Sequence, residues 1–352
     1  MLKQELKVPI VDRSTERAVI ENFVTSAIEV GINQEFARRL ANLLIETSVE
    51  AQRSMRSKDP TRSQTENVAI IGAGGMGSWF ARFFKTRGNP VIISDRDRRK
   101  ARLLASRIHV RWVSSNIEAV KGSDIVVLAT PANVTSNIIH QILPAIAEKT
   151  ILVDICAVKS AVIPALRLAQ KKGVQVASIH PMFGPRTSSL REKNVIVVRT
   201  GAHAEGSKRV EHVLEGARLL AADPQIHDRQ TAVTLALPHF LNLTFAMTMS
   251  GMNLAETRKF AGRTFDLQML LAQTVGNEPQ TTADILTMNK EFRAILRKLQ
   301  RNTRLLAETV NNRDRGKLVA YHQRIRKHLS SDPKFSVAEA AFEKVCEASS
   351  TE

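Results

Sequence analysis

The chain has 352 residues, 43% of them hydrophobic, which is enough for two or three domains with ordinary cores. Its two cysteines, Cys156 and Cys346, cannot form a disulfide framework and fit a reducing compartment. No apolar run approaches the roughly 20 residues that span a membrane, and the polar first residues do not resemble a signal peptide. We therefore expect a soluble cytoplasmic protein with no membrane partner.

The net charge is +17 and the sequence pI is near 10.3. Clustered Lys and Arg are typical of nucleic-acid binding. Here the excess between residues 290 and 327 is spread around a helical pattern, without interleaved aromatic residues. We favour a basic surface that attracts anionic metabolites over a nucleic-acid partner.

The first 56 residues form a helical segment, because apolar residues recur there at steps of three and four. Gly31, Ile32 and Asn33 divide it into two helices. Residues 57–66 are polar, contain one proline and have no periodicity, which predicts a linker.

From residue 67 the pattern changes to short β-branched runs, most of them separated by helical segments. The predicted strands are 68–71, 90–95, 124–131, 150–155, 174–180 and 194–200. Nearly continuous apolar strands that alternate with helices indicate a parallel sheet covered on both faces. We predict a Rossmann-type, doubly wound α/β domain over residues 67–225.

Strand signals end near Pro224, and helical patterns continue over 229–256, 263–275 and 280–328. We predict an all-α domain over residues 226–345 and a frayed tail over 346–352. The apolar stripes of this domain need a partner surface, within the chain or in a second copy.

Gly72, Gly74 and Gly77 form a G-x-G-x-x-G motif between a predicted strand and a helix. The first glycine permits a tight turn, the second lets the backbone approach a pyrophosphate, and the third lets the helix pack on the strand. The amides at the helix N-terminus favour a phosphate. The loop residues expected at the same cofactor are Ala73, Gly75 and Met76.

Asp95 ends the next predicted strand, at the spacing of an acidic residue that binds the hydroxyls of an adenosine ribose. This favours NAD as the cofactor. Arg96 follows directly, and a guanidinium there can hold a 2′-phosphate, so NADP stays open. Thr130 and Pro131 end a further strand at the edge where the ligand of a doubly wound sheet lies.

His180 ends an apolar run and is followed by Pro-Met-Phe-Gly-Pro. Because the carboxyl ends of parallel strands meet at one edge, we expect Asp154 and His180 near the nicotinamide. An isolated histidine at a strand end is more often a cap. Beside a predicted cofactor site, we favour a catalytic role.

From about residue 67 to its end the sequence resembles prephenate dehydrogenase. The motifs that carry the resemblance, in the family's order and spacing, are ILVDICAVKSAV at 151–162, SIHPMFGP at 178–185, His227-Asp228 and LPHF at 237–240. The resemblance implies oxidative decarboxylation of prephenate to 4-hydroxyphenylpyruvate in tyrosine biosynthesis, with hydride transfer to NAD(P)+. It also implies a homodimer formed by the helical domain.

By this resemblance, His180 accepts a hydrogen bond from the substrate hydroxyl as that group becomes a carbonyl, for which an imidazole has a suitable pKa. His239 closes on the substrate from the opposite side. Lys159 either holds the substrate or shapes its loop, and a solvated loop lysine is an equal alternative. We predict no bound metal.

Two positions depart from the family pattern. The serine that usually assists the catalytic histidine is Ala157, and Ser160 is a candidate replacement. The arginine expected to bind a substrate carboxylate is Gln273, so we expect Arg186 or Arg263 to supply the cation. The missing charge also leaves arogenate as an alternative substrate.

The N-terminal segment resembles the later two-thirds of the all-helical chorismate mutase. The residues at that family's active-site positions are Lys3, Asp12, Glu16, Ser48 and Gln52. The long first helix, which supplies two arginines for the dianionic chorismate, has no counterpart, and Thr15 stands where arginine is usual. We expect a structural or dimerising remnant with residual mutase activity at most, or a natural chain that begins upstream of residue 1.

Two other functions stay open. A different NAD(P)-dependent reductase of the same fold would explain the glycine loop, but not HPMFGP together with LPHF. A non-catalytic dinucleotide sensor or RNA-binding protein would explain Ala157, Gln273 and the basic charge. It would not explain the intact glycine loop with Asp95, His180 and His239.

Overall fold

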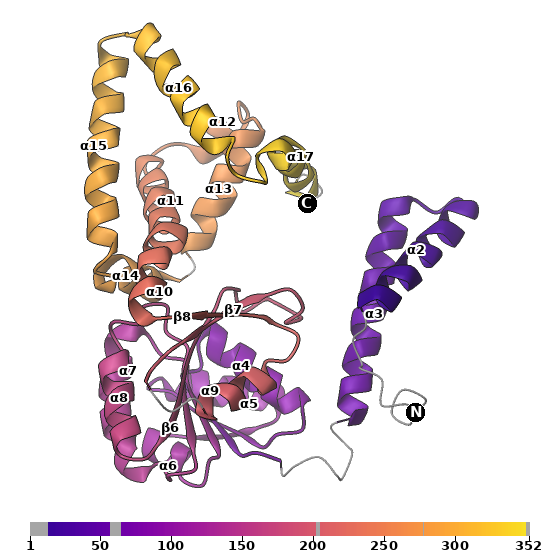
Figure 1. The fold of residues 1–352 in the computed structure, drawn as a ribbon, viewed down its shortest axis with the longest axis vertical. Helices are drawn as coiled ribbons and strands as arrows, with labels where there is room; N and C mark the ends of the chain where they lie inside the picture. Colours follow the sequence, from indigo (N-terminus) through magenta and orange to yellow (C-terminus); the bar gives the residue numbers. More distant parts are fainter. Residues whose placement is uncertain (1–12, 57–64, 202–204, 277, 350–352) are drawn as a thin grey trace.

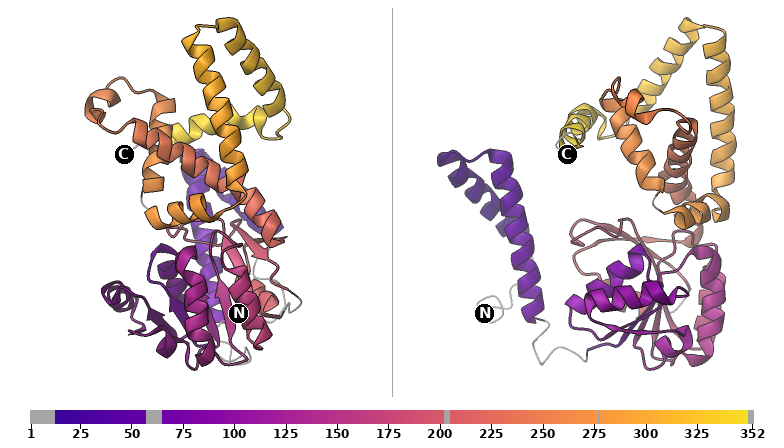
Figure 2. Two further views of the ribbon diagram at one scale, coloured as in Figure 1. Left: turned by 90° about the vertical axis from the view of Figure 1, so that its left-hand side faces the viewer. Right: turned by 180° about the vertical axis from the view of Figure 1, so that it is seen from behind.

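The structure is a computed structural model of the chain. It describes residues 13–56, 65–201, 205–276 and 278–349. A helical hairpin lies beside a central sheet domain, and a helical domain lies against one end of that sheet (Figures 1 and 2). This arrangement follows the predicted order of helical segment, Rossmann domain and all-α domain.

The hairpin consists of α2 (Arg13–Glu29) and α3 (Gln34–Arg56), which confirms the two predicted helices and the break between them. The helices pack through Val24, Ala27 and Ala37. Several larger apolar side chains of the hairpin stay exposed, so its own core is small.

Within the described residues, eight strands form one sheet in the order β3-β2-β1-β4-β5-β6-β7-β8. The strands are β1 (Val68–Ile71), β2 (Val91–Ser94), β3 (Arg111–Val113), β4 (Ile125–Leu128), β5 (Ile151–Asp154), β6 (Gln175–Pro181), β7 (Asn194–Val198) and β8 (Arg218–Ala222). The strands from β3 to β6 are parallel, as predicted, and the order reverses at β1 as in a doubly wound sheet. At the far edge, β7 runs antiparallel to β6 and β8 runs parallel to β7, so a wholly parallel sheet was a wrong prediction there.

Helices cover both faces of the sheet, as Figures 1 and 2 show. The helices that pack on one face are α4 (Gly75–Thr86), α5 (Arg98–Ile108) and α9 (Glu205–Val213). The segments that pack on the other face are α6 (Asn116–Val120), α7 (Ala132–Ile142), η1 (Leu143–Ala145) and α8 (Ile163–Lys171). Because alternate residues of a strand point to opposite faces, a sheet covered on both sides needs strands that are apolar throughout. β1 meets this need, since all four of its residues are buried.

The helical domain begins with one continuous helix, made of α10 (Pro224–Thr231), a π-helical turn η2 (Ala232–Ala236) and α11 (Leu237–Thr248). The remaining segments are α12 (Leu254–Arg258), α13 (Arg263–Gly276), α14 (Pro279–Met288), α15 (Phe292–Asn311), α16 (Arg315–Leu329), η3 (Phe335–Val337) and α17 (Ala338–Ser349). The tail predicted from residue 346 is therefore helical through Ser349. In the part of the chain that the structure describes, no helix is long and apolar enough to cross a membrane.

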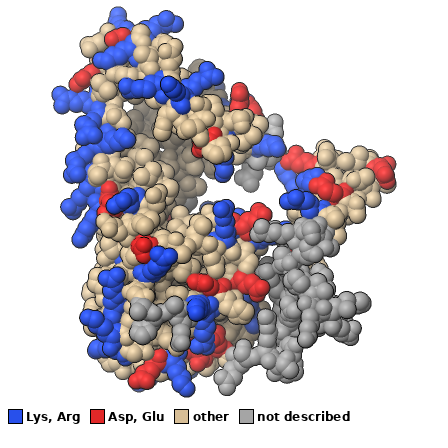
Figure 3. Space-filling model, viewed as in Figure 1, with Lys and Arg blue, Asp and Glu red and all other residues tan. Residues whose placement is uncertain are grey.

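The surface of the helical domain is both apolar and basic. Large apolar side chains are exposed, including Phe260 at 85% and Met247 at 69%. Lys and Arg gather along the outer side of α15 (Figure 3). The exposed basic residues of this helix are Arg293, Arg297, Lys298, Arg301 and Arg304. These exposed apolar side chains are available to a protein partner.

The turn from β1 to α4 allows no side chain at two of its glycines. A Cβ at Gly72, where φ is +107°, would lie 2.3 Å from the Ala129 carbonyl oxygen, and one at Gly77 would lie 1.8 Å from the Gly72 carbonyl oxygen. Gly74 differs, because nothing lies within 4 Å of its Cβ position. The first and third glycines of the motif are thus required by packing.

We expect Gly77→Ala to lower the free energy of unfolding by at least about 2 kcal/mol, because the methyl group overlaps a carbonyl that the turn holds in place. Gly74→Ala is the matched control, with an expected change below about 1 kcal/mol. Urea unfolding followed by circular dichroism measures both variants. Equal stability of the two would contradict this description of the turn.

Candidate active site

The glycine loop is held to the end of β2 by Asp95. Its carboxylate accepts hydrogen bonds from the Ala73 amide at 2.6 Å and from the Asp97 amide at 2.7 Å. Each carboxylate oxygen keeps a further lone pair for a ligand hydroxyl. Since the Cβ position of Gly74 faces open space while its neighbours pack tightly, the loop fits a phosphate that approaches the backbone. These residues fit the predicted dinucleotide, and Arg96 lies exposed beside them.

The loop that follows β6 folds over the glycine loop. A Cβ at Gly75 would lie 2.9 Å from the Pro185 side chain. The Trp79 indole of α4 donates to the Thr187 carbonyl at 2.8 Å, and its ring lies 4.9 Å from that of Phe183. The residues after His180 therefore anchor its strand end to the cofactor-binding turn.

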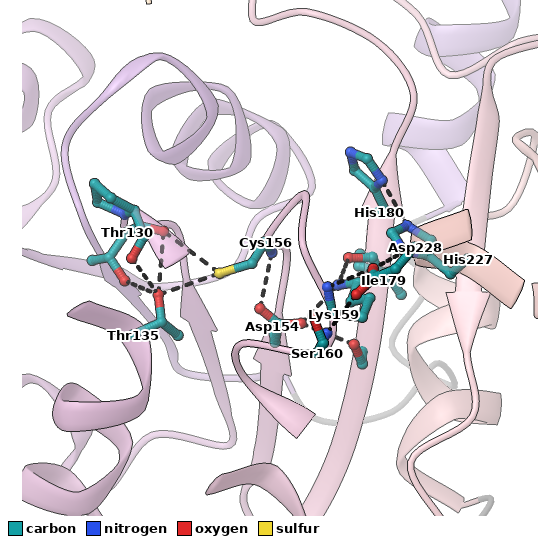
Figure 4. A network of polar contacts seen from close by, with 12 residues as sticks. Thr130, Thr135, Asp154, Cys156, Lys159, Ser160, Ile179, His180, His227 and Asp228 are labelled. Atoms are coloured by element: carbon teal, nitrogen blue, oxygen red, sulfur yellow. Dashed lines mark hydrogen bonds and ion pairs between the residues drawn. The ribbon is translucent and has the colours of Figure 1, made fainter. Parts of the chain in front are cut away.

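A buried ion pair joins β5 to β6 beneath this edge (Figure 4). Lys159 Nζ lies 2.7 Å from Asp154 Oδ2 and donates to the Ile179 carbonyl at 2.7 Å, and neither charged side chain has any exposed surface. Ser178, the register neighbour of Asp154, donates its hydroxyl to the same carboxylate at 2.8 Å. The solvated alternative for Lys159 is wrong, and its position fits a role in shaping the loop. Asp154 is likewise enclosed rather than open to a ligand.

Two histidines and an aspartate form a chain of hydrogen bonds at the end of β6 (Figure 4). His180 Nδ1 lies 2.9 Å from His227 Nε2, and His227 Nδ1 lies 2.8 Å from Asp228 Oδ1. The backbone amides of Lys159 and Ser160 donate to the two carboxylate oxygens of Asp228 at 2.9 and 2.8 Å. Ser160 therefore contacts Asp228, not His180.

The surroundings keep both imidazoles neutral and the carboxylate charged. Burial lowers the pKa of His180 well below its usual value, and His227 and Lys159 lower it further. Burial also lowers the pKa of His227, against the opposing hydrogen bond to Asp228. Although burial opposes it, hydrogen bonds from His227, Lys159 and Ser160 lower the pKa of Asp228. A neutral imidazole at position 180 is able to accept a proton.

Cys156 links the ends of β4 and β5. Its Sγ lies 3.2 Å from the Thr135 hydroxyl and 3.7 Å from the carbonyl of Thr130, which is half-buried and precedes the exposed Pro131. Burial raises the pKa of this thiol well above its usual value. Among the described residues, no group of three or more His, Cys, Asp or Glu side chains is placed to hold a metal ion.

The helical domain meets the cofactor edge through α11 and α14. His239 Nδ1 lies 3.2 Å from the Thr282 hydroxyl, and burial lowers the pKa of His239, opposed by Glu278. Glu278 also lies 4.0 Å from the Cβ position of Gly75, in the glycine loop. Asp284 accepts the first amides of α7, at 3.3 Å from Asn133, and burial raises its pKa. His239 thus lies in the part of the helical domain that faces the loop.

The three residues predicted near a substrate carboxylate lie at different places in the fold. Arg186 is exposed in the loop after β6, and it has no ion pair within the described residues. Gln273 is exposed in the last turn of α13. Arg263 lies at the other end of that helix and pairs with Glu343 of α17. No hydrogen bond or ion pair joins Gln273 or Arg263 to His180 in the part of the chain that is described.

The mutase-like positions are only partly described. Glu16 is buried, and its Oε2 lies 2.7 Å from Nη2 of Arg191, which belongs to the loop between β6 and β7. This ion pair attaches the hairpin to the sheet domain. Ser48 is exposed on α3. The positions that lie outside the described residues are Lys3, Asp12 and the side chain of Gln52.

A doubly wound sheet with a glycine loop after its first strand places the chain in the class of dinucleotide-binding Rossmann folds, to which many dehydrogenases belong. The sequence matches two profiles of one family. Residues 80–223 match "Prephenate dehydrogenase, nucleotide-binding domain", and residues 223–324 match "Prephenate dehydrogenase, dimerization domain". The chain therefore belongs to the prephenate dehydrogenase family.

Individual proteins show the same similarity. The chain is 34% identical over 275 residues to a "Probable arogenate/prephenate dehydrogenase" of Methanocaldococcus jannaschii, covering 76% of this chain and 62% of that relative. It is 24% identical to the "T-protein" of Haemophilus influenzae, covering 92% of this chain and 82% of the relative. The crystal structure of the A. aeolicus prephenate dehydrogenase, with hydroxyphenyl propionate and NAD+, shares the fold at a TM-score of 0.62 and 22% identity, over 77% of this chain and 100% of that one.

His227 and Asp228 were not predicted as site residues, although their motif contributed to the resemblance. The structure places them between the sheet and the helical domain, with His227 in direct contact with His180 and Asp228 bonded to the far side of His227. An adjacent His-Asp pair at the start of a helix was the available signal. Its contact with His180 could not be inferred, because it depends on how the first helix of the second domain docks.

The stability of the protein should fall as the pH drops below about 6.5. His180 and His227 have lowered pKa values in the fold, so the unfolded chain binds protons first and is favoured by acid. Between its unfolded and folded pKa values, each histidine can change the free energy of unfolding by up to about 1.4 kcal/mol per pH unit. Urea unfolding at pH 7.5 and pH 5.5 measures the loss.

The control is His180→Asn, which removes one of the two titrating groups and should lose less stability over the same interval. An identical pH dependence of the variant and the parent protein would contradict the neutral, buried state of His180.

Proposed function

We propose that the protein is a prephenate dehydrogenase, which oxidatively decarboxylates prephenate to 4-hydroxyphenylpyruvate. The observation that carries this proposal is the place of His180 at the end of β6, where the following loop packs on the glycine loop; burial lowers the pKa of its imidazole, which favours the neutral form. Membership of the prephenate dehydrogenase family supports it.

The residues of the protein bind and orient the substrate, and one of them holds the proton that the substrate gives up. A bound nicotinamide would supply the hydride acceptor. His180 receives the hydrogen bond of the ring hydroxyl while the carbon that bears it loses hydride, and a positioned base of this kind contributes about 10²–10⁴ in rate. The electron pair of the bond to the departing carbon dioxide completes the aromatic ring. The phenol oxygen then takes back the proton, so none is released overall.

NAD is the coenzyme that this site supports better. The oxygens of Asp95 can accept the hydrogen bonds of both ribose hydroxyls while they hold the loop amides. A 2′-phosphate would bring negative charge against this carboxylate, although Arg96 offers a cation beside it. The A. aeolicus protein of the same fold was solved with NAD+.

The proposed substrate class also includes arogenate, which the name of the archaeal relative mentions. Gln273 brings no charge to the position of a carboxylate-binding arginine, so it does not separate the two substrates by charge. We further propose a homodimer through the helical domain, where large apolar side chains are exposed. For the hairpin we propose a structural role, because its Glu16 is paired with Arg191.

His180→Asn should lower kcat at least about 10²-fold, because asparagine cannot accept the hydroxyl proton. The measurement is NADH absorbance at 340 nm with prephenate, and in parallel with arogenate and with NADP. Coenzyme binding, and thermal unfolding at pH 7.5, should change little in this variant. Turnover at the parent rate would rule out His180 as the base, and a parent protein inactive on both substrates would refute the function.

Arg186→Ala should raise the KM for prephenate at least about tenfold, because Arg186 lies free in the loop next to His180 and carries the missing cation. Arg263→Ala is the matched control and should leave KM within about twofold, since this arginine pairs with Glu343 at the far end of α13. The reverse pattern would assign the substrate carboxylate to Arg263.

A further inference from the structure

We propose that His227 and Asp228 are positioning residues that fix the tautomer of His180 and take over the charge of the proton that it accepts. The inference rests on the proposed function, because it describes how His180 works as the base. It is carried by the chain of hydrogen bonds that joins His180 to His227 and His227 to Asp228.

The proton positions follow from the donors and acceptors along this chain. The Asp228 carboxylate is an acceptor, and two backbone amides already donate to it. Its 2.8 Å contact with His227 therefore needs a proton on His227 Nδ1. A neutral imidazole carries one N–H, so His227 Nε2 is a bare acceptor.

The same reasoning assigns the proton of His180. Its Nδ1 lies 2.9 Å from the bare Nε2 of His227 and must therefore carry the proton. The Nε2 of neutral His180 then keeps its lone pair for the substrate hydroxyl. Within the described residues, His227 is the hydrogen-bond partner of the His180 ring, and Ala157 has no hydroxyl to offer. Without this partner, His180 is free to adopt the other tautomer, which places a proton where the lone pair is needed.

The chain of hydrogen bonds also makes His227 a better place than His180 for the positive charge. When the hydroxyl proton bonds to His180 Nε2, the Nδ1 proton can cross to His227 Nε2, one N–H bond breaking as the other forms. The imidazolium is then paired with Asp228 at 2.8 Å, whereas on His180 it would have no carboxylate as a hydrogen-bond partner within the described residues; Lys159 opposes the charge at both positions. Both protons return when the ring oxygen becomes a phenolate, so atoms and charge balance over the reaction.

The test compares two substitutions of similar size. His227→Gln can keep an oxygen acceptor at the place of Nε2, whereas His227→Leu removes it. We expect Leu to lower kcat at least about 100-fold, with KM for prephenate and the dissociation constant of NAD within about threefold. Gln should stay within about tenfold of the parent kcat. If the two variants, both folded by circular dichroism, lose the same activity, the role of His227 is structural only and the proposal fails.

A second measurement does not depend on turnover. In protein labelled with ¹⁵N-histidine, the long-range ¹H–¹⁵N spectrum should show His180 and His227 both protonated at Nδ1 and bare at Nε2. The variants His180→Asn and His227→Gln identify the two sets of signals. The opposite tautomer of His180 in the parent protein would overturn the proposal. Absence of prephenate oxidation in protein that shows the expected tautomers would instead refute the proposed function.

Discussion

The edge of the sheet that carries the candidate active site depends on one buried lysine. The ammonium of Lys159 balances Asp154 at the end of β5 and binds the carbonyl of Ile179 in β6, and its backbone amide holds Asp228 at the start of the helical domain. Loss of one partner of a buried ion pair typically destabilises a protein by about 3–5 kcal/mol, because the other charge stays buried. Lys159 thus contacts two strands and the helical domain, and these contacts hold the strand end that carries His180 in place.

The charge of Lys159 also affects the chemistry of its neighbours. Its field opposes protonation of both His180 and His227, while Asp228 favours it. In the proposed mechanism, a buried base beside a cation stays neutral until a substrate proton arrives, and the Asp228 carboxylate stabilises the charge that then forms. The ion pair that supports the fold is in this way part of the electrostatics of the site.

Most of the sheet domain was predictable because its signals are local. Buried strands are short apolar runs, and the spacing of Gly72, Gly74 and Gly77 identifies a turn between a strand and a helix. β3 and β8 were missed because both are edge strands whose residues are partly exposed, so neither has a continuous apolar pattern. The antiparallel edge was missed because the direction of a strand depends on the path of its connecting loop.

The site was predictable only where its residues lie at strand ends. His180 could be placed from the end of an apolar run, but its partner His227 lies 47 residues away and Asp228 lies 69 residues from Lys159. The role of Gly75 was assigned to the cofactor, and only the structure shows that Pro185 also needs the space. Such contacts depend on domain docking, which short-range patterns do not encode.

The π-helical turn η2 lies within the single helix that carries both His227 and His239. A π turn holds one residue more than an α turn, and a residue corresponds to about 100° of rotation about the helix axis. The wider turn absorbs one residue, so losing a residue between 232 and 236 would restore regular α geometry while the later side chains of the helix keep nearly the same directions. The same loss within α11 itself would rotate every later side chain by about 100° about the helix axis.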